Sequence, residues 1–188
     1  MTQQDNIVLY YHQAYERVIR AGYQEEINWC RNMPKFEDCT PERFFEQYVW
    51  CVLNAGMKEQ IARKIWEKYL TNLDPLTIGH LGKRKAIEKG LQEYVKWFGE
   101  LKCAKDPIEY LVTLPWIGNI TKYHLARNIG FDCVKPDRHL VKIAEHFGYK
   151  SPYKMCLKIQ KSTPQTPLGV IDVVLWRDCN IRNTPGVS

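Results

Sequence analysis

The sequence predicts an all-α protein. Apolar residues recur at helical spacing along most of the chain, and no segment alternates apolar and polar residues long enough to make a convincing strand. Two segments, Thr40-Pro41 and Asp106-Pro107, carry a helix N-cap residue followed by proline at the first helical position. The hydrophobic content of 45% argues against disorder, and 188 residues can bury one core or form two small lobes that share a cleft.

The first half of the chain contains four predicted helices. Residues 5–21 place their apolar side chains at helical spacing and are followed by a short segment and a loop. Residues 41–56 are apolar around most of the helix circumference, which predicts a central helix that is largely buried. Residues 58–70 and 83–98 are amphipathic, and they predict two further helices joined by a connector.

The second half begins with a helix over residues 107–114. This helix should end before Pro115, because proline lacks an N–H and disfavours helical geometry at the residue before it. A second helix is expected over 120–130, and a third over 138–147 after a short link. Two more helices complete the all-α pattern, over residues 152–160 and 168–179.

The tight turn Pro115–Asn119 between two of these helices predicts a contact with nucleic acid. Gly118 permits the positive φ that such a turn needs. The turn is followed by the amides at the start of a helix, and free N–H groups there attract a phosphate. The segment therefore predicts a small clamp on a nucleic acid backbone that is indifferent to base sequence.

The hairpin LPWIGNIT, followed by Lys135-Pro136-Asp137-Arg138-His139, resembles the helix-hairpin-helix and catalytic aspartate of a DNA glycosylase superfamily. This superfamily, HhH-GPD, includes endonuclease III and the adenine-mismatch glycosylases. Its hairpin is roughly L-P-G-[VI]-G-x-[KT]-T, with an Asp-x-His about sixteen residues beyond the threonine, here Thr121. The resemblance is densest over residues 108–147.

The resemblance implies a two-lobed helical glycosylase fold with a DNA-binding cleft between the lobes. All 188 residues would form this one domain, with lobe 1 over about 36–105 and lobe 2 over about 1–35 plus 106–188. The partner would be double-stranded DNA, bound by a monomer. The hairpin residues expected to bind the DNA are Pro115, Trp116, Ile117, Gly118, Asn119, Thr121 and Lys122.

Asp137 would be the catalytic residue. Breaking an N-glycosidic bond gives the sugar oxocarbenium character, and a fixed carboxylate stabilises that positive charge and can orient water. Asp137 follows Pro136 and should be a helix N-cap, where the amides favour its ionised form. A plain cap explains the same residue, and the two roles are compatible. His139 matches the Asp-x-His and would support catalysis, or it simply packs in the first helical turn.

The end of the predicted helix 41–56 would face the DNA. Relatives place a residue there that fills the gap left by an extruded nucleotide, which makes Asn54, Gly56 and Met57 candidate wedge residues. An ordinary helix C-terminus that stops at glycine explains these residues equally well. The walls of a base pocket would be aromatic, with the candidates Tyr23, Trp29, Phe36, Tyr48 and Trp50.

Two departures from the superfamily pattern affect the expected chemistry. Relatives that also cut the strand use a lysine immediately before the threonine to form a Schiff base, and that position here is Ile120. Lys122 lies roughly on the other side of the helix at about 100° per residue, so we expect it to contact phosphate instead. Trp116 replaces the first hairpin glycine and offers an apolar or stacking surface.

The sequence therefore predicts a monofunctional glycosylase that hydrolyses the bond to a damaged, mismatched or modified base flipped out of duplex DNA. Two alternatives remain open. One is an enzyme of the same fold that processes modified pyrimidines, as in viral base hypermodification. The other is a non-catalytic helix-hairpin-helix binding protein, which the Asp-x-His at catalytic spacing disfavours.

The charge and composition of the chain indicate what kind of partner, cellular location and cofactor to expect. The net charge of +6 favours an anionic partner, and seven basic residues lie between Lys135 and Lys161 against two acidic ones. No apolar run is long enough for a membrane span and no signal peptide is evident, so we expect an intracellular protein. The seven cysteines are scattered, which predicts no metal site and no iron–sulfur cluster. We expect no cofactor, with a monovalent cation at the hairpin left open.

Overall fold

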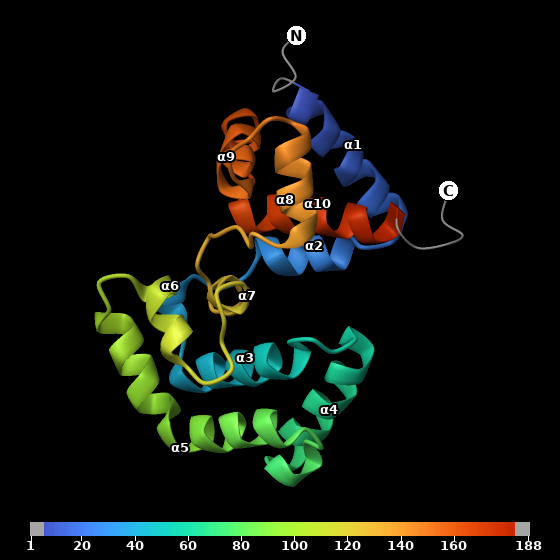
Figure 1. The fold of residues 1–188 in the computed structure, drawn as a ribbon. Coiled ribbons are helices and arrows are strands. Elements are labelled where there is room, and N and C mark those ends of the chain that lie inside the picture. Colours follow the sequence, from blue (N-terminus) through green and yellow to red (C-terminus); the bar gives the residue numbers. More distant parts are fainter. Residues whose placement is uncertain (1–5, 183–188) are drawn as a thin grey trace. The chain divides into compact units, whose positions relative to one another are not determined.

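The computed structural model of the chain describes residues 6–182, and all regular structure in this range is helical. The predicted all-α class is therefore confirmed (Figure 1). The α-helices, in chain order, are α1 Asn6–Arg20, α2 Gln24–Arg31, α3 Pro41–Asn54, α4 Glu59–Asn72, α5 Leu81–Cys103, α6 Pro107–Tyr110, α7 Thr121–Asn128, α8 Arg138–His146, α9 Pro152–Ser162 and α10 Leu168–Arg182. Three short 3₁₀ turns complete the list: Phe36–Asp38, Pro75–Thr77 and Leu111–Thr113.

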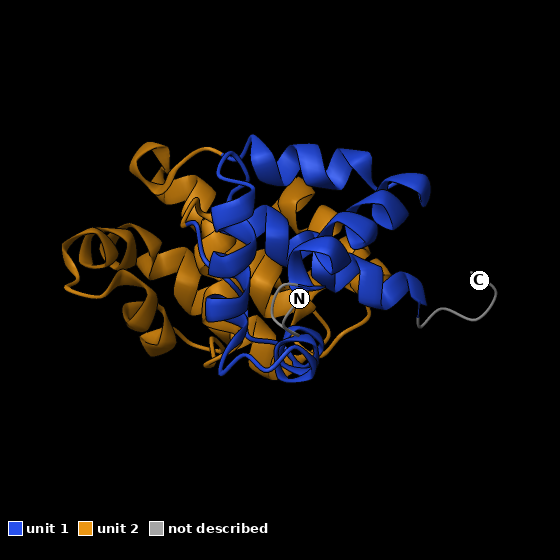
Figure 2. Cartoon of the chain, turned by 90° about the horizontal axis from the view of Figure 1, so that it is seen from above, with its two compact units in different colours: residues 1–33, 132–188 blue, residues 34–131 orange. Residues whose placement is uncertain are grey.

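The helices form two compact units (Figure 2). Unit 1 combines the chain up to residue 33 with the chain from residue 132 onward, and unit 2 is residues 34–131. This differs from the expected division, which placed residues 106–131 with the terminal helices. These residues belong with unit 2 because α6 packs on α5, and α7 packs on α3. Side chains strengthen the attachment, since Phe131 stacks on Phe36 with ring centroids 4.2 Å apart.

Unit 1 is built around α10. This helix is apolar on nearly all sides, and it packs against α1, α2, α8 and α9 (Figure 1). Its core includes Ile171, Val174 and Leu175, all fully buried. A helix that is apolar all round has to be covered on every face, which explains why the N-terminal helices pack on a C-terminal one.

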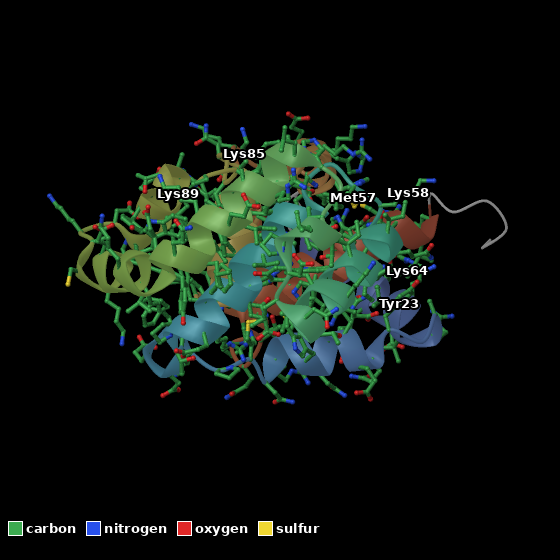
Figure 3. The ribbon with its side chains drawn as sticks, turned by 90° about the horizontal axis from the view of Figure 1, so that it is seen from below. Tyr23, Met57, Lys58, Lys64, Lys85 and Lys89 are labelled. Atoms are coloured by element: carbon green, nitrogen blue, oxygen red, sulfur yellow. The ribbon has the colours of Figure 1, made fainter. Side chains whose placement is uncertain are left out.

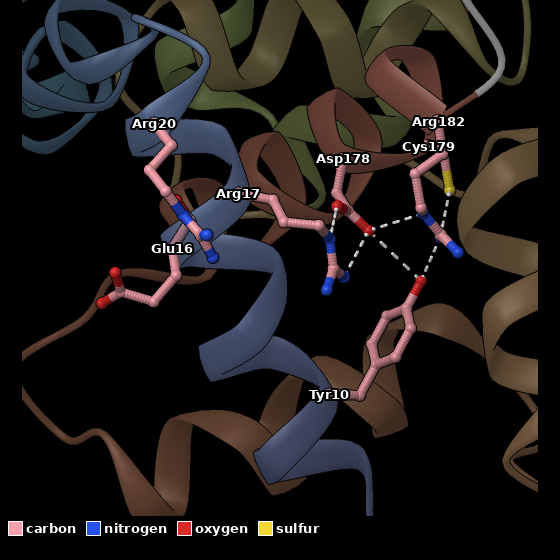
Figure 4. Close-up of polar contacts among 7 residues, drawn as sticks. All are labelled: Tyr10, Glu16, Arg17, Arg20, Asp178, Cys179 and Arg182. Carbon is pink, nitrogen blue, oxygen red and sulfur yellow. Dashed lines mark hydrogen bonds and ion pairs between the residues drawn. The ribbon is translucent and has the colours of Figure 1, made fainter. Parts of the chain in front are cut away.

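One buried carboxylate in α10 is balanced by charge from two directions (Figure 4). Asp178 is fully buried, and its oxygens accept from Arg17 Nε at 2.6 Å and Arg17 Nη2 at 3.1 Å. Arg182 lies one turn further along α10, with its Nε 3.0 Å from Asp178 Oδ2. The neighbouring Tyr10 hydroxyl also donates to Asp178 Oδ2, at 3.4 Å, and burial raises the pKa of this hydroxyl to about 12. Pairing of this kind is what makes a buried carboxylate tolerable.

Unit 2 is built around α3. As the sequence predicted, this helix is largely buried, and it packs against α4, α5 and α7. Thr40 accepts a hydrogen bond from Arg43 N, which confirms the predicted N-cap and proline start. Helix α5 runs from Leu81 to Cys103 and is longer than the expected 83–98. The segment expected as one helix over 107–114 is divided into α6 and a 3₁₀ turn.

Gly130 lies near the end of unit 2, against the backbone of residues 34–36 at its start. We expect its replacement to destabilise the protein strongly. Its φ is +105°, and a Cβ at this position would lie 2.4 Å from Pro34 O and 2.5 Å from Phe36 N, which are backbone atoms. Gly130→Ala should lower the free energy of unfolding by about 3 kcal/mol or more, measured by urea denaturation. Gly56→Ala is the matched control, because Gly56 has φ +69° but open space around it. That change should cost only about 1–2 kcal/mol, and equal costs would contradict the close approach.

Candidate functional site

The hairpin between α6 and α7 has a left-handed residue at an unexpected position. Trp116 has φ +67°, whereas Gly118 is absent from the positive-φ residues of the described chain. The expectation that Gly118 supplies the positive φ is therefore wrong. Trp116 stands where the superfamily pattern has its first hairpin glycine, and it keeps the backbone conformation that glycine would take more readily. The strain of order 1–2 kcal/mol has to be offset by contacts of the indole.

Those contacts come from the start of α5. The Trp116 ring lies so close to Gly82 that a Cβ there would be 2.6 Å from its Cζ3 atom. The ring also meets the His80 imidazole edge-on, with centroids 5.2 Å apart. Trp116 nevertheless remains 43% exposed. The indole is thus anchored on one side and open on the other, which suits a stacking surface.

A buried tyrosine fixes the hairpin to the core of unit 2. The Tyr48 hydroxyl lies 2.9 Å from Pro115 O and 3.2 Å from Ala86 O, so α3 is connected both to the turn and to α5. Tyr48 is completely buried. The sequence makes Tyr48 a candidate wall of a base pocket, but its contacts make it a support for the hairpin.

The hairpin residues expected to bind DNA differ in their exposure. Trp116, Gly118 and Asn119 are exposed, Pro115 and Thr121 are half-buried, and Ile117 and Lys122 are buried. The turn is closed by hydrogen bonds from Ile117 N to Leu114 O at 3.2 Å and from Lys122 N to Gly118 O at 2.9 Å. The exposed residues of the hairpin are therefore Trp116 and the run Gly118-Asn119-Ile120.

Lys122 does not have the geometry of a phosphate contact. Its side chain is 6% exposed, and its ammonium lies 2.6 Å from Glu109 Oε1 in α6. The same nitrogen lies over the Tyr123 ring, 5.1 Å from the centroid. The ammonium would have to leave this pair before it could reach a phosphate or a sugar. Ile120, immediately before Thr121 at the start of α7, is 44% exposed.

Asp137 is the N-cap of α8, as predicted. Its Oδ1 accepts hydrogen bonds from His139 N at 2.9 Å and Leu140 N at 3.1 Å. Oδ2 takes no part in this cap and is left for another contact. The side chain is half-buried. His139 is also half-buried, with its Nε2 3.4 Å from Arg138 Nε.

The turn after α3 is held by a lysine that the sequence did not single out. Lys83 is 3% exposed, and its ammonium donates to Leu53 O and Ala55 O at 2.7 Å each. Burial lowers the pKa of this amine. The two acceptors are carbonyls at the C-terminal end of α3, where a positive charge is favourable. Sequence analysis missed Lys83 because its partners lie about thirty residues away along the chain.

The candidate wedge residues are in this turn. Asn54 and Met57 are half-buried, and Gly56 is exposed with φ +69°. Met57 and the exposed Lys58 are visible in Figure 3. Since Gly82 lies against Trp116 and Lys83 binds Leu53 O and Ala55 O, one turn of α5 contacts both the hairpin and the turn that carries the candidate wedge residues. Figure 3 also shows further exposed lysines of unit 2, namely Lys64, Lys85 and Lys89.

Within residues 6–182, no helix is long and apolar enough to cross a membrane, and no group of three or more His, Cys, Asp or Glu side chains could hold a metal ion. Six cysteines are buried and Cys103 is exposed.

Comparison with known proteins identifies the fold. No protein-family model matches the chain, and no curated protein matches it. Among solved structures, it is similar to the Methanocaldococcus jannaschii 8-oxoguanine glycosylase/lyase in complex with a 15mer DNA containing 8-oxoguanine. The TM-score is 0.64 at 18% sequence identity, over 94% of this chain and 98% of that one. The predicted helical glycosylase fold is therefore confirmed, while an endonuclease III-like subtype is not shown.

The Tyr48 contacts lead to a test of the hairpin support. Tyr48→Phe should lower the free energy of unfolding by about 1–3 kcal/mol, because Pro115 O loses its buried donor. Burial raises the pKa of this hydroxyl above its ordinary value of 10.0. The unfolded chain therefore releases the proton near pH 10 while the folded chain keeps it, so the contribution of Tyr48 to stability falls as pH rises above about 10.

Urea denaturation of both proteins between pH 8 and pH 11 measures this effect. The difference in stability between wild type and Tyr48→Phe should shrink above about pH 10. A difference that stayed constant over this range would show that the hydroxyl is not a buried donor.

Proposed function

We propose that the protein is a DNA glycosylase that removes a damaged, mismatched or modified base from duplex DNA. The observation that carries the proposal is Asp137: a carboxylate at the start of α8, after a helix-hairpin-helix, in a chain with the helical glycosylase fold. The protein would act as an intracellular monomer and need no cofactor. The solved structure with this fold has damaged DNA bound, which supports the same class of partner here.

The chemistry would depend on the fixed charge of Asp137. As the bond between C1′ and the base breaks, positive charge develops on the sugar, and an ionised carboxylate beside it stabilises the transition state. The cap occupies Oδ1, so Oδ2 is the oxygen available to face the sugar or to orient the attacking water. Because the carboxylate is already ordered by two amides, little reorganisation is needed at the moment of reaction.

Binding would use the hairpin and the basic surface. The exposed Trp116 indole and the Gly118-Asn119 backbone suit contact with a sugar–phosphate chain. The basic residues between Lys135 and Lys161, all in unit 1, are exposed or half-buried, and they add positive charge near Asp137 in the sequence. Flipping the base costs a few kcal/mol, which the turn 54–57 would help to offset by filling the gap.

The absence of a lysine at position 120 supports hydrolysis without strand cutting. A Schiff base needs an amine that can reach C1′ in its neutral form. Position 120 is isoleucine, and the Lys122 ammonium is buried and paired with Glu109. Water activated or oriented by Asp137 is the nucleophile that remains.

Removing the charge at position 137 tests the catalytic role. Asp137→Asn keeps a residue that can cap α8 but loses the carboxylate, so base release should fall by about 10²–10³-fold. The assay uses a panel of duplexes with different lesions or modified pyrimidines, treated with alkali to cut at abasic sites. DNA affinity should change little. Asp74→Asn is the matched control, because Asp74 also accepts a backbone hydrogen bond as a cap. Unchanged release from Asp137→Asn would remove this residue from the mechanism.

Borohydride trapping tests the hydrolytic mechanism. Wild type should give no covalent adduct with the DNA, because no hairpin lysine is placed to attack C1′. Ile120→Lys should gain a trapped adduct, since it supplies an amine at the position that strand-cutting relatives use. Asn119→Lys, which adds a lysine at the adjacent position, should not. Efficient trapping by the wild type would show that a lysine acts as nucleophile.

A further inference from the structure

The segment that leads into Asp137 is held by a different helix. Residues 132–136 form no regular structure, and α8 begins only at Arg138. Side chains of Cys133 and Val134 are buried, at 7% and 4% exposed. Such a segment has few backbone hydrogen bonds of its own, so its position depends on the groups that bind it.

Two carboxylates connect this segment to α10. Asp132 Oδ1 accepts from Gly169 N, in the first turn of α10, at 2.9 Å. Asp172 Oδ2 accepts from Lys135 N at 2.5 Å. Gly169 and Asp172 are three residues apart and therefore lie on the same face of the helix. The segment is thus held at both ends by one face of α10.

Asp172 is unusual for its surroundings. It is 1% exposed, and its neighbours in α10 are the buried Ile171 and Val173. A buried carboxylate is costly unless it is well hydrogen-bonded, so an apolar residue would satisfy the packing of this helix better. The carboxylate accepts a hydrogen bond from Lys135 N, so it holds the backbone of the segment before Asp137.

The Lys135 amide transmits this contact to Asp137. The Lys135 carbonyl accepts from Asp137 N at 2.8 Å, while its N–H is bound by Asp172. Pro136, between the two, has a fixed φ and little freedom to absorb a shift. A displacement of Lys135 would therefore be passed on to Asp137.

We propose that Asp172 is a positioning residue for catalysis: its carboxylate binds the Lys135 amide and thereby sets the place of the Asp137 carboxylate. The inference rests on the proposed glycosylase function. Loss of the contact between Asp172 and the Lys135 amide would shift the Asp137 carboxylate. A misplacement of about 1 Å at a catalytic group can cost on the order of 10²-fold in rate. DNA binding through the hairpin of unit 2 does not depend on Asp172.

Single-turnover base release and DNA affinity, measured separately, test the proposal. Asp172→Ala removes the acceptor and should slow base release by about 10–100-fold, with a Kd for DNA within about twofold of wild type. Asp172→Asn retains an oxygen acceptor and should recover most of the rate. The control is Asp178→Ala, which removes an equally buried carboxylate of α10 that binds Arg17 instead. At a temperature where all variants are folded, the control should lose less than about threefold in rate.

Two results would overturn the proposal. One is an equal loss of rate in Asp172→Ala and Asp178→Ala, because this would mean that Asp172 only stabilises α10. The other is a wild-type rate for Asp172→Ala.

Hydrogen exchange of the Lys135 amide gives a readout that does not need activity. This amide should be protected in wild type although it lies outside any helix, and it should exchange at least several-fold faster in Asp172→Ala. If that variant does not fold, the weaker neutral acceptor of Asp172→Asn should still speed the exchange. Equal exchange in wild type and variant refutes the contact. If wild type releases no base from any duplex, the glycosylase proposal fails, while the exchange result still decides whether Asp172 holds the segment.

Discussion

The hydrogen bonds between the Asp137 carboxylate and the first amides of α8 are the interaction on which the proposed site depends. The same contact starts the helix and orders the charged group. Because both bonds end on Oδ1, the helix is capped while Oδ2 keeps its capacity to meet a ligand. The cap therefore holds the proposed catalytic carboxylate in one place without any further element.

Around that contact, unit 1 is organised by α10. The helix is so apolar that it has to be enclosed, and the few carboxylates it carries each have a defined partner. Asp178 pairs with arginines of α1 and of α10 itself, whereas Asp172 binds the backbone that precedes Asp137. The first pairing stabilises the packing of α1 on α10. The second connects the core of the unit to the proposed catalytic group.

Unit 2 fixes its two proposed DNA-contacting elements to one turn of α5. Gly82 receives the Trp116 ring, Lys83 binds the carbonyls at the end of α3, and Tyr48 connects α3 to both α5 and the hairpin. These contacts explain how tryptophan can occupy a left-handed position that favours glycine. The glycine that the ring requires is at position 82, on the neighbouring helix. The hairpin is therefore rigid at its base and exposed at its tip.

Local interactions were readable from the sequence, because their partners are within a few residues of one another. This is why the all-α class, the caps at Thr40, Asp106 and Asp137, and the position of the hairpin could all be predicted. The absence of lysine at position 120 is likewise a fact of the sequence alone.

Tertiary structure decided the partners of the long side chains and the conformation of the turn. From the sequence, Lys122 is a basic residue suited to a phosphate contact. In the structure its ammonium is buried and forms an ion pair with Glu109. Lys83 and Asp172 appear in the sequence as ordinary helical residues, and their roles depend on carbonyls and an amide about thirty or more residues away. The positive φ fell on Trp116 and not on Gly118 because Gly82 leaves room for the indole. Residues 106–131 belong to unit 2 because α6 packs on α5 and α7 packs on α3, and no local sequence pattern records these contacts.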